Sequence, residues 1–182
     1  MAILKVARMG HPVLRRVADP VPPADIPGPA VQGLIRDLLD TVDEYNGAGL
    51  AAPQVHVSRR VVVLALDESG MRVWINPVLT PLTDDHLVTL EGCLSVPGLR
   101  GAVARPAAVR VQALDQNGDE VDLQLTGFPA VVAQHECDHL DGVLYVDRLE
   151  PRTLAFTEEL GRFGSPLAEP DPGDEDSTSE EV

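Results

Sequence analysis

The chain has 182 residues, 44% of them hydrophobic, and a net charge of −15. This length suits one domain with a sizeable core. Seven acidic residues and no Lys or Arg follow Phe163, and removing their charge from −15 leaves −8, which argues against a broadly basic nucleic-acid face. No apolar N-terminal leader or run of membrane-spanning length is present, and two cysteines suit a reducing compartment. We therefore expect a cytoplasmic protein with no membrane association.

Apolar spacing predicts the helices and strands. Residues at i, i+3 and i+4 spacing predict a first helix over residues 31–42. Strand-like runs follow at 61–66, 72–79, 86–90, 107–114 and 120–125, and Asn117-Gly118 predicts a hairpin with a type I′ turn between the last two. Helical patterns then cover residues 128–140 and 154–163. Residues 164–182 are rich in acids, Pro, Gly and Ser, which predicts a disordered tail.

The predicted helix over residues 128–140 carries the motif His135-Glu136-x-x-His139. Histidines four residues apart project from one face of a helix and can share one metal ion. Glu136 is turned by about 100° from His135, so it can hold a water molecule without being a ligand. For this motif alone, two helical histidines without a metal remain an alternative.

A third ligand is expected, because hydrolytic metal sites usually have three protein ligands and one open position. No His or acid stands at the familiar distance after His139, but Cys93 follows the strand-like run at 86–90. A thiolate with two imidazoles accepts iron(II), zinc, cobalt or nickel. At the end of the glycine-containing segment 47–54, Gln54 offers an amide that can donate to a developing oxyanion.

Three segments together resemble the peptide deformylase family. Its motifs are G-x-G-L-A-A-P-Q, E-G-C-L-S and Q-H-E-x-D-H-L-x-G, and they are complete here at residues 47–54, 91–95 and 134–142. The similarity covers residues 1–163, which are expected to form a single catalytic domain. It implies an α+β fold in which antiparallel or mixed β-sheets pack around a central helix that carries the H-E-x-x-H motif.

The resemblance also implies an activity, namely removal of the N-formyl group from the N-terminal formylmethionine of newly made polypeptides, with release of formate. It implies one divalent metal ion per chain, iron(II) in the cell, which zinc, nickel or cobalt can replace. Glu136 matches the acid/base, and Gln54 with the Leu94 amide matches the groups that stabilise the oxyanion. Cys93, His135 and His139 match the metal ligands of the family.

The resemblance places the substrate beside seven residues: Gly47, Ala48, Gly49, Leu50, Gly92, Val131 and Val132. The two valines and Leu50 would wall an apolar pocket for the methionine side chain, and the peptide backbone would lie extended beside Gly49 and Gly92. The chain departs from the family pattern at Ala48, where Ile or Val is usual, and at Thr89, where an apolar residue is common. Both departures would make the entrance of the site wider or more polar.

Four further residues are expected to support the ligands from behind: Glu91, Ser95, Arg105 and Asp138. We expect Asp138 to pair with Arg105 or Arg100 and to steady the helix. Cys137 is turned by about 200° from His135 around the helix, so it is expected to be a buried thiol that faces away from the metal.

The expected partners are nascent formyl-Met polypeptides, met transiently near the ribosome, without direct nucleic-acid binding. Two other functions are weighed against this one. A zinc metallopeptidase shares H-E-x-x-H but needs a ligand downstream of His139, and Cys93 in its motif argues against it. A catalytically silent metal-binding module would need neither Glu136 nor Gln54.

Overall fold

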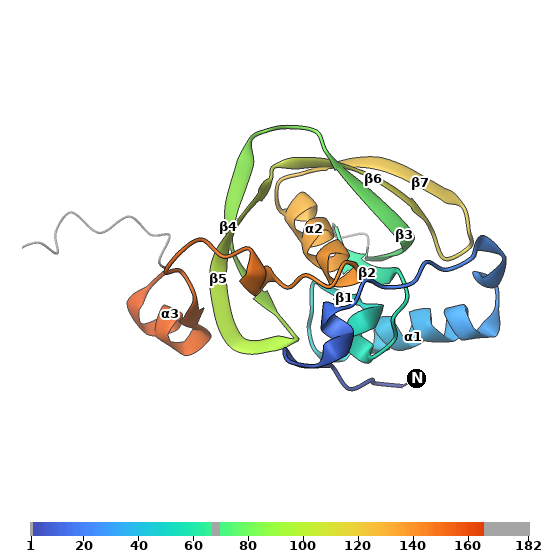
Figure 1. Cartoon of the computed structure of the whole chain (residues 1–182), viewed down its shortest axis with the longest axis horizontal. Helices are drawn as coiled ribbons and strands as arrows, with labels where there is room; N and C mark the ends of the chain where they lie inside the picture. Colours follow the sequence, from blue (N-terminus) through green and yellow to red (C-terminus); the bar gives the residue numbers. More distant parts are fainter. Residues whose placement is uncertain (1, 67–69, 166–182) are drawn as a thin grey trace, which may run out of the picture.

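The computed structural model describes residues 2–66 and 70–165, and it places two antiparallel β-sheets around one central helix (Figure 1). The larger sheet has the order β1 (Gly49–Ala51), β2 (Val61–Ala65), β3 (Met71–Pro81), β6 (Ala108–Leu114) and β7 (Glu120–Thr126). The smaller sheet has the order β4 (His86–Cys93), β5 (Val96–Pro106) and β8 (Ala155–Phe156). The α+β prediction is confirmed. From residue 166 onward, the predicted tail lies outside the described residues.

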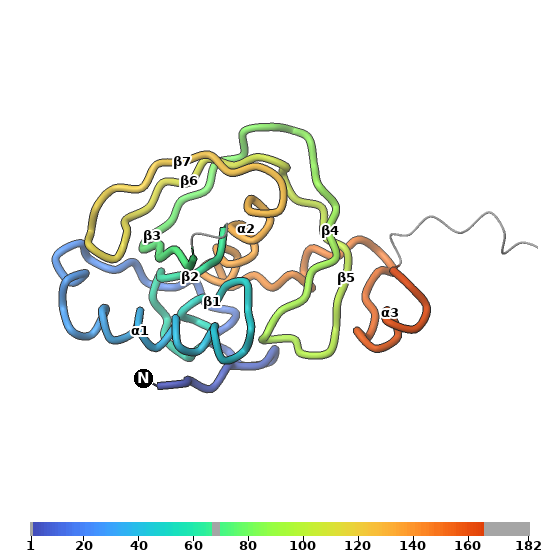
Figure 2. The backbone as a smooth tube through the Cα atoms, turned by 180° about the vertical axis from the view of Figure 1, so that it is seen from behind, coloured from blue at the N-terminus to red at the C-terminus, as the bar shows by residue number. Residues whose placement is uncertain are grey.

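The helices occupy three different positions (Figures 1 and 2). The central helix α2 (Phe128–Leu140) packs against strands of both sheets, whereas α1 (Pro29–Glu44) packs on β1 and β2. Helix α3 (Thr157–Phe163) contacts β5 and β8, on the side of the small sheet away from α2. Short 3₁₀ segments are η1 (Pro12–Arg15), η2 (Pro23–Asp25), η3 (Ala52–Val55) and η4 (Tyr145–Asp147). Within residues 2–66 and 70–165, no helix is both long and apolar enough to cross a membrane.

Strand β2 explains how the core holds α2 in place. Its first four residues are fully buried, because successive side chains of a strand point to opposite faces and both faces are covered. Val61 and Val63 join a hydrophobic cluster with Leu38 of α1. Val62 and Leu64 join a second cluster with α2. The sheet is therefore packed between α1 and α2, and α2 is fixed along its length.

Strand β5 is an element that the apolar pattern did not predict. It contains Pro97, Gly98 and Gly101, which are depleted in strands, and charged side chains interrupt its apolar positions. It forms because β4 pairs with it over nearly its whole length. The predicted start of the last helix at residue 154 is wrong for a related reason, since residues 155 and 156 pair with β5 as β8 before α3 begins at Thr157.

The β6–β7 hairpin is confirmed, but its predicted type I′ turn is wrong. A type I′ turn needs positive φ at both central residues, and here Gly118 has φ of 86° while Asn117 is not among the residues with positive φ. The N–H of Gly118 bonds to the Asp115 carbonyl at 3.1 Å, which makes a three-residue loop with glycine in the left-handed position. The Asp115 carboxylate fixes this loop, because Oδ1 accepts the N–H groups of Asn117 at 2.7 Å and Asp119 at 2.9 Å.

Candidate metal centre and active site

Cys93, His135 and His139 meet beside the central helix. Cys93 is the last residue of β4, and the two histidines lie one turn apart on α2 with ring centroids 5.1 Å apart. One ligand atom from each residue lies within 4.8 Å of the others, and Cys93 Sγ is 3.3 Å from His139 Nε2. The structure thus brings together the three side chains that the sequence predicts as metal ligands.

The turn between β4 and β5 sets the position of Cys93. The strand register shifts after Gly92, so Cys93 pairs with Val96 across a tight turn. Such irregularities re-aim side chains next to functional sites. The sulfur then receives two hydrogen bonds, from the backbone N–H of Ser95 at 3.4 Å and from Gln54 Nε2 at 3.5 Å. The thiol is held at the edge of α2 by both sheet geometry and these donors.

Glu91 sets the orientation of His135. The Nδ1 atom of His135 lies 2.8 Å from Glu91 Oε2, which leaves Nε2 for a ligand on the other side of the ring. Although burial raises the pKa of Glu91, hydrogen bonds from His135 and Arg105 outweigh it and hold that pKa below its usual value. The carboxylate is therefore ionised and can only accept, so Nδ1 carries the proton.

Burial and neighbouring charges set the protonation of the other groups. Burial opposes a proton on His135, but hydrogen bonds to Cys93 and Glu91 outweigh it and raise the pKa of His135 to about 10. Burial raises the pKa of Glu136 to about 7. Burial also lowers the pKa of His139 well below its usual value, and the charge on His135 adds to this. His139 is therefore neutral and offers a lone pair, and a metal cation would replace a proton on His135.

Glu136 lies next to the ligands with one oxygen unpaired. Its side chain is 5% exposed, and Oε2 has no hydrogen-bond partner among the described residues. Leaving a buried polar oxygen unpaired costs free energy, so such an atom calls for an explanation. A metal ion on the adjacent ligand set, with its water or substrate, would supply the partner. The donor set and this oxygen therefore fit a bound metal.

Gly49 gives Glu136 its space. A Cβ atom at Gly49 would lie 2.6 Å from both Cγ and Oε1 of Glu136, which is closer than atoms pack. The backbone of β1 therefore approaches the carboxylate as only a glycine allows. Gln54 is fixed nearby, because its Oε1 accepts the Ala51 N–H at 2.8 Å and its Nε2 donates to Ser95 Oγ at 3.2 Å.

A cavity of about 340 Å³ opens onto this centre. Most of the predicted substrate residues line it, among them Val131 and Val132 of α2, and Thr89 lines it as well. Leu50 is not among its lining residues, since its fully buried side chain belongs to the core cluster with α1. Phe128 and Arg100 line the cavity and were not predicted to do so. The predicted residues in its wall are Gly47, Ala48, Gly49, Gln54, Glu91, Gly92, Cys93, Leu94, Val131, Val132, His135 and Glu136.

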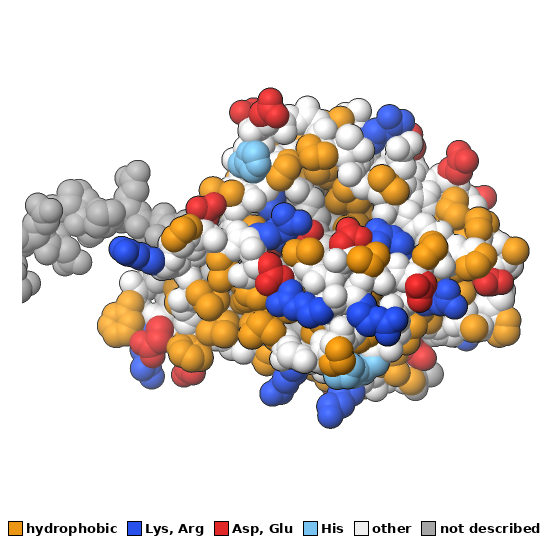
Figure 3. All heavy atoms as spheres, viewed as in Figure 1, with side chains coloured by type: hydrophobic (Ala, Val, Ile, Leu, Met, Phe, Trp, Pro, Cys, Tyr) orange, Lys and Arg blue, Asp and Glu red, His pale blue; other side chains and the backbone are white. Residues whose placement is uncertain are grey.

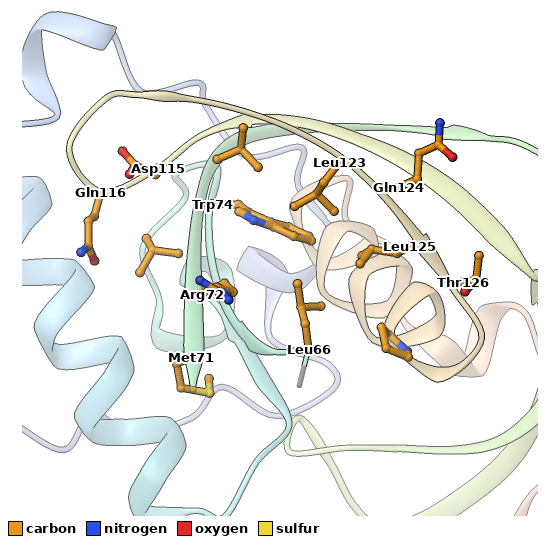
Figure 4. Close-up of a pocket in the computed structure, with 13 residues that line it drawn as sticks. Leu66, Met71, Arg72, Trp74, Asp115, Gln116, Leu123, Gln124, Leu125 and Thr126 are labelled. Atoms are coloured by element: carbon orange, nitrogen blue, oxygen red, sulfur yellow. The ribbon is translucent and has the colours of Figure 1, made fainter. Parts of the chain in front are cut away.

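A larger hollow, of about 690 Å³, lies elsewhere, between β3 and the β6–β7 hairpin (Figure 4). Trp74, Leu123 and Leu125 point into it beside α2. Its lining residues include no Cys, no His and none of the residues predicted for the site. The larger hollow therefore lacks the side chains that could bind a metal or transfer a proton. The smaller cavity, which contains them, is the candidate active site.

A network of charged side chains, most of them buried, contacts His135 through Glu91. Arg105 of β5 donates to Glu91 at 2.5 and 3.0 Å and to Asp138 at 2.8 Å. The predicted pair of Asp138 with Arg105 is confirmed, whereas Arg100 does not take part. Arg148 also binds Asp138, and sequence reasoning missed it because the pattern gave no signal for a partner beyond the end of α2. Cys137 is buried and lines a separate hollow, as expected of a thiol that faces away from the ligands.

Comparison with known proteins agrees with this geometry. The family model described as polypeptide deformylase matches residues 3–155. Peptide deformylase 1 of Prochlorococcus marinus (strain MIT 9313) is 47% identical over 175 residues, 90% of each chain. The actinonin-bound class I type b peptide deformylase from Acinetobacter baumannii has a TM-score of 0.78 at 38% identity, covering 82% of this chain and 100% of that chain. Its Met-Ala-Ser-bound structure has a TM-score of 0.77 at 36% identity, covering 81% and 99%. The chain therefore belongs to the polypeptide deformylase family and is a metal-dependent hydrolase that removes the N-formyl group from newly made polypeptides.

Proposed function

We propose that Cys93, His135 and His139 hold one divalent metal ion, at which the formyl group is hydrolysed. The observation that carries this proposal is the approach of the three ligand atoms within 4.8 Å of one another. A divalent ion held there would lower the pKa of a bound water molecule and polarise a carbonyl group. Once such an ion has replaced their protons, the three residues would supply two imidazoles and one thiolate, a set that suits a divalent metal and keeps one position open.

Glu136 carries the proton in this proposal. Its carboxylate accepts a proton from water as the formyl carbon is attacked, and it returns the proton to the amine that leaves. Burial raises its pKa to about 7, so both protonation states are accessible near neutral pH. The close approach of Gly49 leaves no room for a side chain at this position beside the carboxylate. Glu136 therefore acts as a positioned acid and base rather than a ligand.

Two donors stabilise the charge that develops on the formyl oxygen. Gln54 is 2% exposed, and the Ala51 N–H fixes its amide so that Nε2 faces the cavity side near Cys93. The backbone N–H of Leu94 is the second donor, from the turn that follows Cys93. Gln54 would exchange its 3.5 Å contact with Cys93 Sγ for the formyl oxygen. Donors that are held in position cost little reorganisation as the charge forms, which is why they lower the barrier.

The cavity selects formylmethionine by size and polarity. Val131 and Val132 offer apolar surface to the methionine side chain, and the formyl carbon carries only hydrogen, so a narrow site admits it and rejects bulkier acyl groups. The substrate backbone lies extended beside Gly49 and Gly92 and borrows strand-like hydrogen bonds. A relative from A. baumannii has been solved with Met-Ala-Ser bound, which supports a peptide in this cavity.

We further propose that the ion is iron(II) in the cell, replaceable by zinc, nickel or cobalt, and that the enzyme works near the ribosome without binding nucleic acid itself. Nucleic-acid binding is dominated by phosphate contacts from Lys and Arg. This chain has a net charge of −15, and on the face drawn in Figure 3 basic and acidic side chains are interspersed. Such a surface does not favour docking on a polyanion.

The two cysteines allow a matched test of the centre. The Cys93→Ser variant should lose most of its bound metal and should release little formate from formyl-Met-Ala-Ser. The Cys137→Ser variant should keep its metal and its activity, because Cys137 faces away from the proposed ligands. Metal content is measured by elemental analysis, and formate and free amine are measured separately. Acetyl-Met-Ala-Ser serves as the substrate control. Equal metal loss in both variants, or cleavage of unformylated peptides, would overturn the proposal.

A further inference from the structure

We propose that Arg148 is a positioning residue of the metal centre, which acts on the ligand His135 through Asp138, Arg105 and Glu91. This inference rests on the function proposed above. Arg148 follows η4 and lies outside all three family motifs, and it neither lines the active-site cavity nor offers a metal ligand. It nevertheless begins an unbroken series of short contacts that ends at a ligand ring.

Each step of this series is a charged hydrogen bond. Arg148 Nε and Nη2 donate to Asp138 Oδ2 and Oδ1, both at 2.8 Å. Arg105 Nη1 donates to Asp138 Oδ2 at 2.8 Å, and its Nε and Nη2 donate to Glu91 at 2.5 and 3.0 Å. Glu91 then accepts from His135 at 2.8 Å. Charged pairs with two parallel bonds fix direction as well as distance, so the orientation of one group constrains the next.

Arg148 is the exposed end of the series, and the other members are largely buried. The Arg148 side chain is 48% exposed, Asp138 is 12% exposed, Arg105 is 3% and Glu91 is 5%. Arg148 is therefore the member that solvent reaches, and the others depend on one another. An exposed arginine that anchors a buried network can be replaced without opening a core cavity, which makes its role testable.

The balance of charge shows why Arg148 is needed. Arg105 alone faces two carboxylates, Glu91 and Asp138, and Arg148 supplies the second positive charge. Without it, Arg105 is the only arginine left to bind both carboxylates, and Asp138 Oδ1 loses the guanidinium that it accepts from. Buried charges need partners, so Arg105 would turn toward Asp138 and loosen its paired bonds to Glu91. Glu91 would then hold the His135 ring less firmly.

The test compares Arg148→Met with Arg148→Lys in protein loaded with Zn²⁺ or Co²⁺. Partners behind metal ligands typically matter 10- to 100-fold for metal affinity, and since Arg148 acts one step further away, we expect Arg148→Met to release Zn²⁺ to a chelator about 3- to 10-fold faster. The Co²⁺ absorption bands should broaden or shift. Lysine keeps the charge but not the two parallel bonds, so Arg148→Lys should lie between Arg148→Met and the unchanged protein.

Arg110→Met is the matched control, because Arg110 is about as exposed as Arg148 and makes the same two-bond pair, but with an exposed carboxylate, Asp122 of the β6–β7 hairpin. It should leave Zn²⁺ release unchanged. If Arg148→Met releases Zn²⁺ at the unchanged rate with an unchanged Co²⁺ spectrum, the inference is wrong. His135→Ala distinguishes this from failure of the proposed function: if His135→Ala also keeps its metal, the ligand assignment itself fails.

Discussion

Glu91 Oε2 accepts a hydrogen bond from His135 Nδ1 at 2.8 Å, and Glu91 Oε1 accepts one from Arg105 Nε. One carboxylate therefore connects the small sheet to the ring of a proposed ligand on α2. Because β4 supplies both Glu91 and Cys93, the same strand also carries a second proposed ligand. The hairpin of β4 and β5 thus positions two of the three proposed ligands, and the fold and the metal centre share this element.

Glu91→Gln should destabilise the metal-free protein in a pH-dependent way. Burial raises the pKa of Glu91, but bonds from His135 and Arg105 outweigh it, so the folded pKa lies below 4.5. The stabilisation by ionised Glu91 is therefore complete above pH 4.5 and is lost as pH falls through the lower, folded value. Near neutral pH, urea unfolding should show a loss on the order of 3 kcal/mol, since Arg105 loses a buried partner.

As pH falls through the folded pKa of Glu91, which lies below 4.5, the unfolding free energies of the two proteins should converge, because Glu91 of the unchanged protein then becomes protonated too. Asp122→Asn is the control, since its pair with Arg110 is half exposed, and it should change stability little at any pH. A Glu91→Gln penalty that does not diminish in acid would show that the carboxylate charge is not what stabilises the fold.

Glu136→Gln should separate proton transfer from metal binding. The amide keeps the shape of the side chain but cannot accept a proton, so kcat should fall by about 10²- to 10⁴-fold while metal content stays the same. The measurement pairs formate release with elemental analysis. If Glu136→Gln loses metal as completely as His135→Ala, Glu136 is a ligand and its assignment as acid and base is wrong.

The sequence predicts the centre better than its surroundings. The helix predicted over residues 128–140 matches α2 at both ends, because apolar spacing and Gly142 mark it locally. The ligands are recognisable because their residue types and spacing carry the chemistry. The turn at Asn117-Gly118 was predicted with the wrong type, because the local pair could not reveal that Asp115 caps the loop.

Long-range pairing accounts for the other differences. Strand β5 forms because β4 and β8 pair with it, and its buried Arg105 is tolerated because two carboxylates from other elements bind it. Leu50 was predicted as pocket wall, but the packing of α1 against β1 places it in the core. Arg148 binds Asp138 because the chain turns after α2, and the residue spacing in the sequence does not predict the course of that turn. These contacts depend on the assembled fold.

The iron(II) form should lose activity in air faster than a nickel form. A thiolate at Cys93 would lie next to iron(II) and an open coordination position, where oxygen can oxidise both. Nickel(II) is less readily oxidised than iron(II). Half-lives of formate release are compared with and without oxygen, and oxidation of Cys93 is followed by mass spectrometry. Equal half-lives of the two metal forms in air would contradict the thiolate–iron assignment.

Truncation after Phe163 should leave deformylation and thermal stability nearly unchanged. The residues removed are acidic and polar and contain few groups able to join a core. Ribosome affinity, where measurable, should stay the same or rise, most clearly at low salt where charge repulsion is least screened. Co-sedimentation with ribosomes at two salt concentrations checks this. Markedly weaker binding of the truncated protein at low salt would identify the segment as a docking element.

Gly49→Ala should damage catalysis while the fold survives. The added Cβ would lie 2.6 Å from Glu136 Cγ and Oε1, and Glu136 is buried, so the carboxylate must shift. A displacement of about 1 Å at a reacting group can cost on the order of 10²-fold in rate, so kcat should fall by about that factor. Metal content should stay close to normal, because the three atoms nearest to the new one all belong to Glu136, which is not a proposed ligand.

Gly33→Ala is the matched control for this substitution. In α1 the new Cβ would meet only Arg36 Nη2 at 3.8 Å, an ordinary contact, and alanine favours a helix interior by roughly 0.5–1 kcal/mol over glycine. It should therefore keep full activity and unfold at a slightly higher temperature. If Gly49→Ala is as active as Gly33→Ala, the position of Glu136 does not depend on the close approach of β1, and the proposed positioning of this carboxylate has to be abandoned.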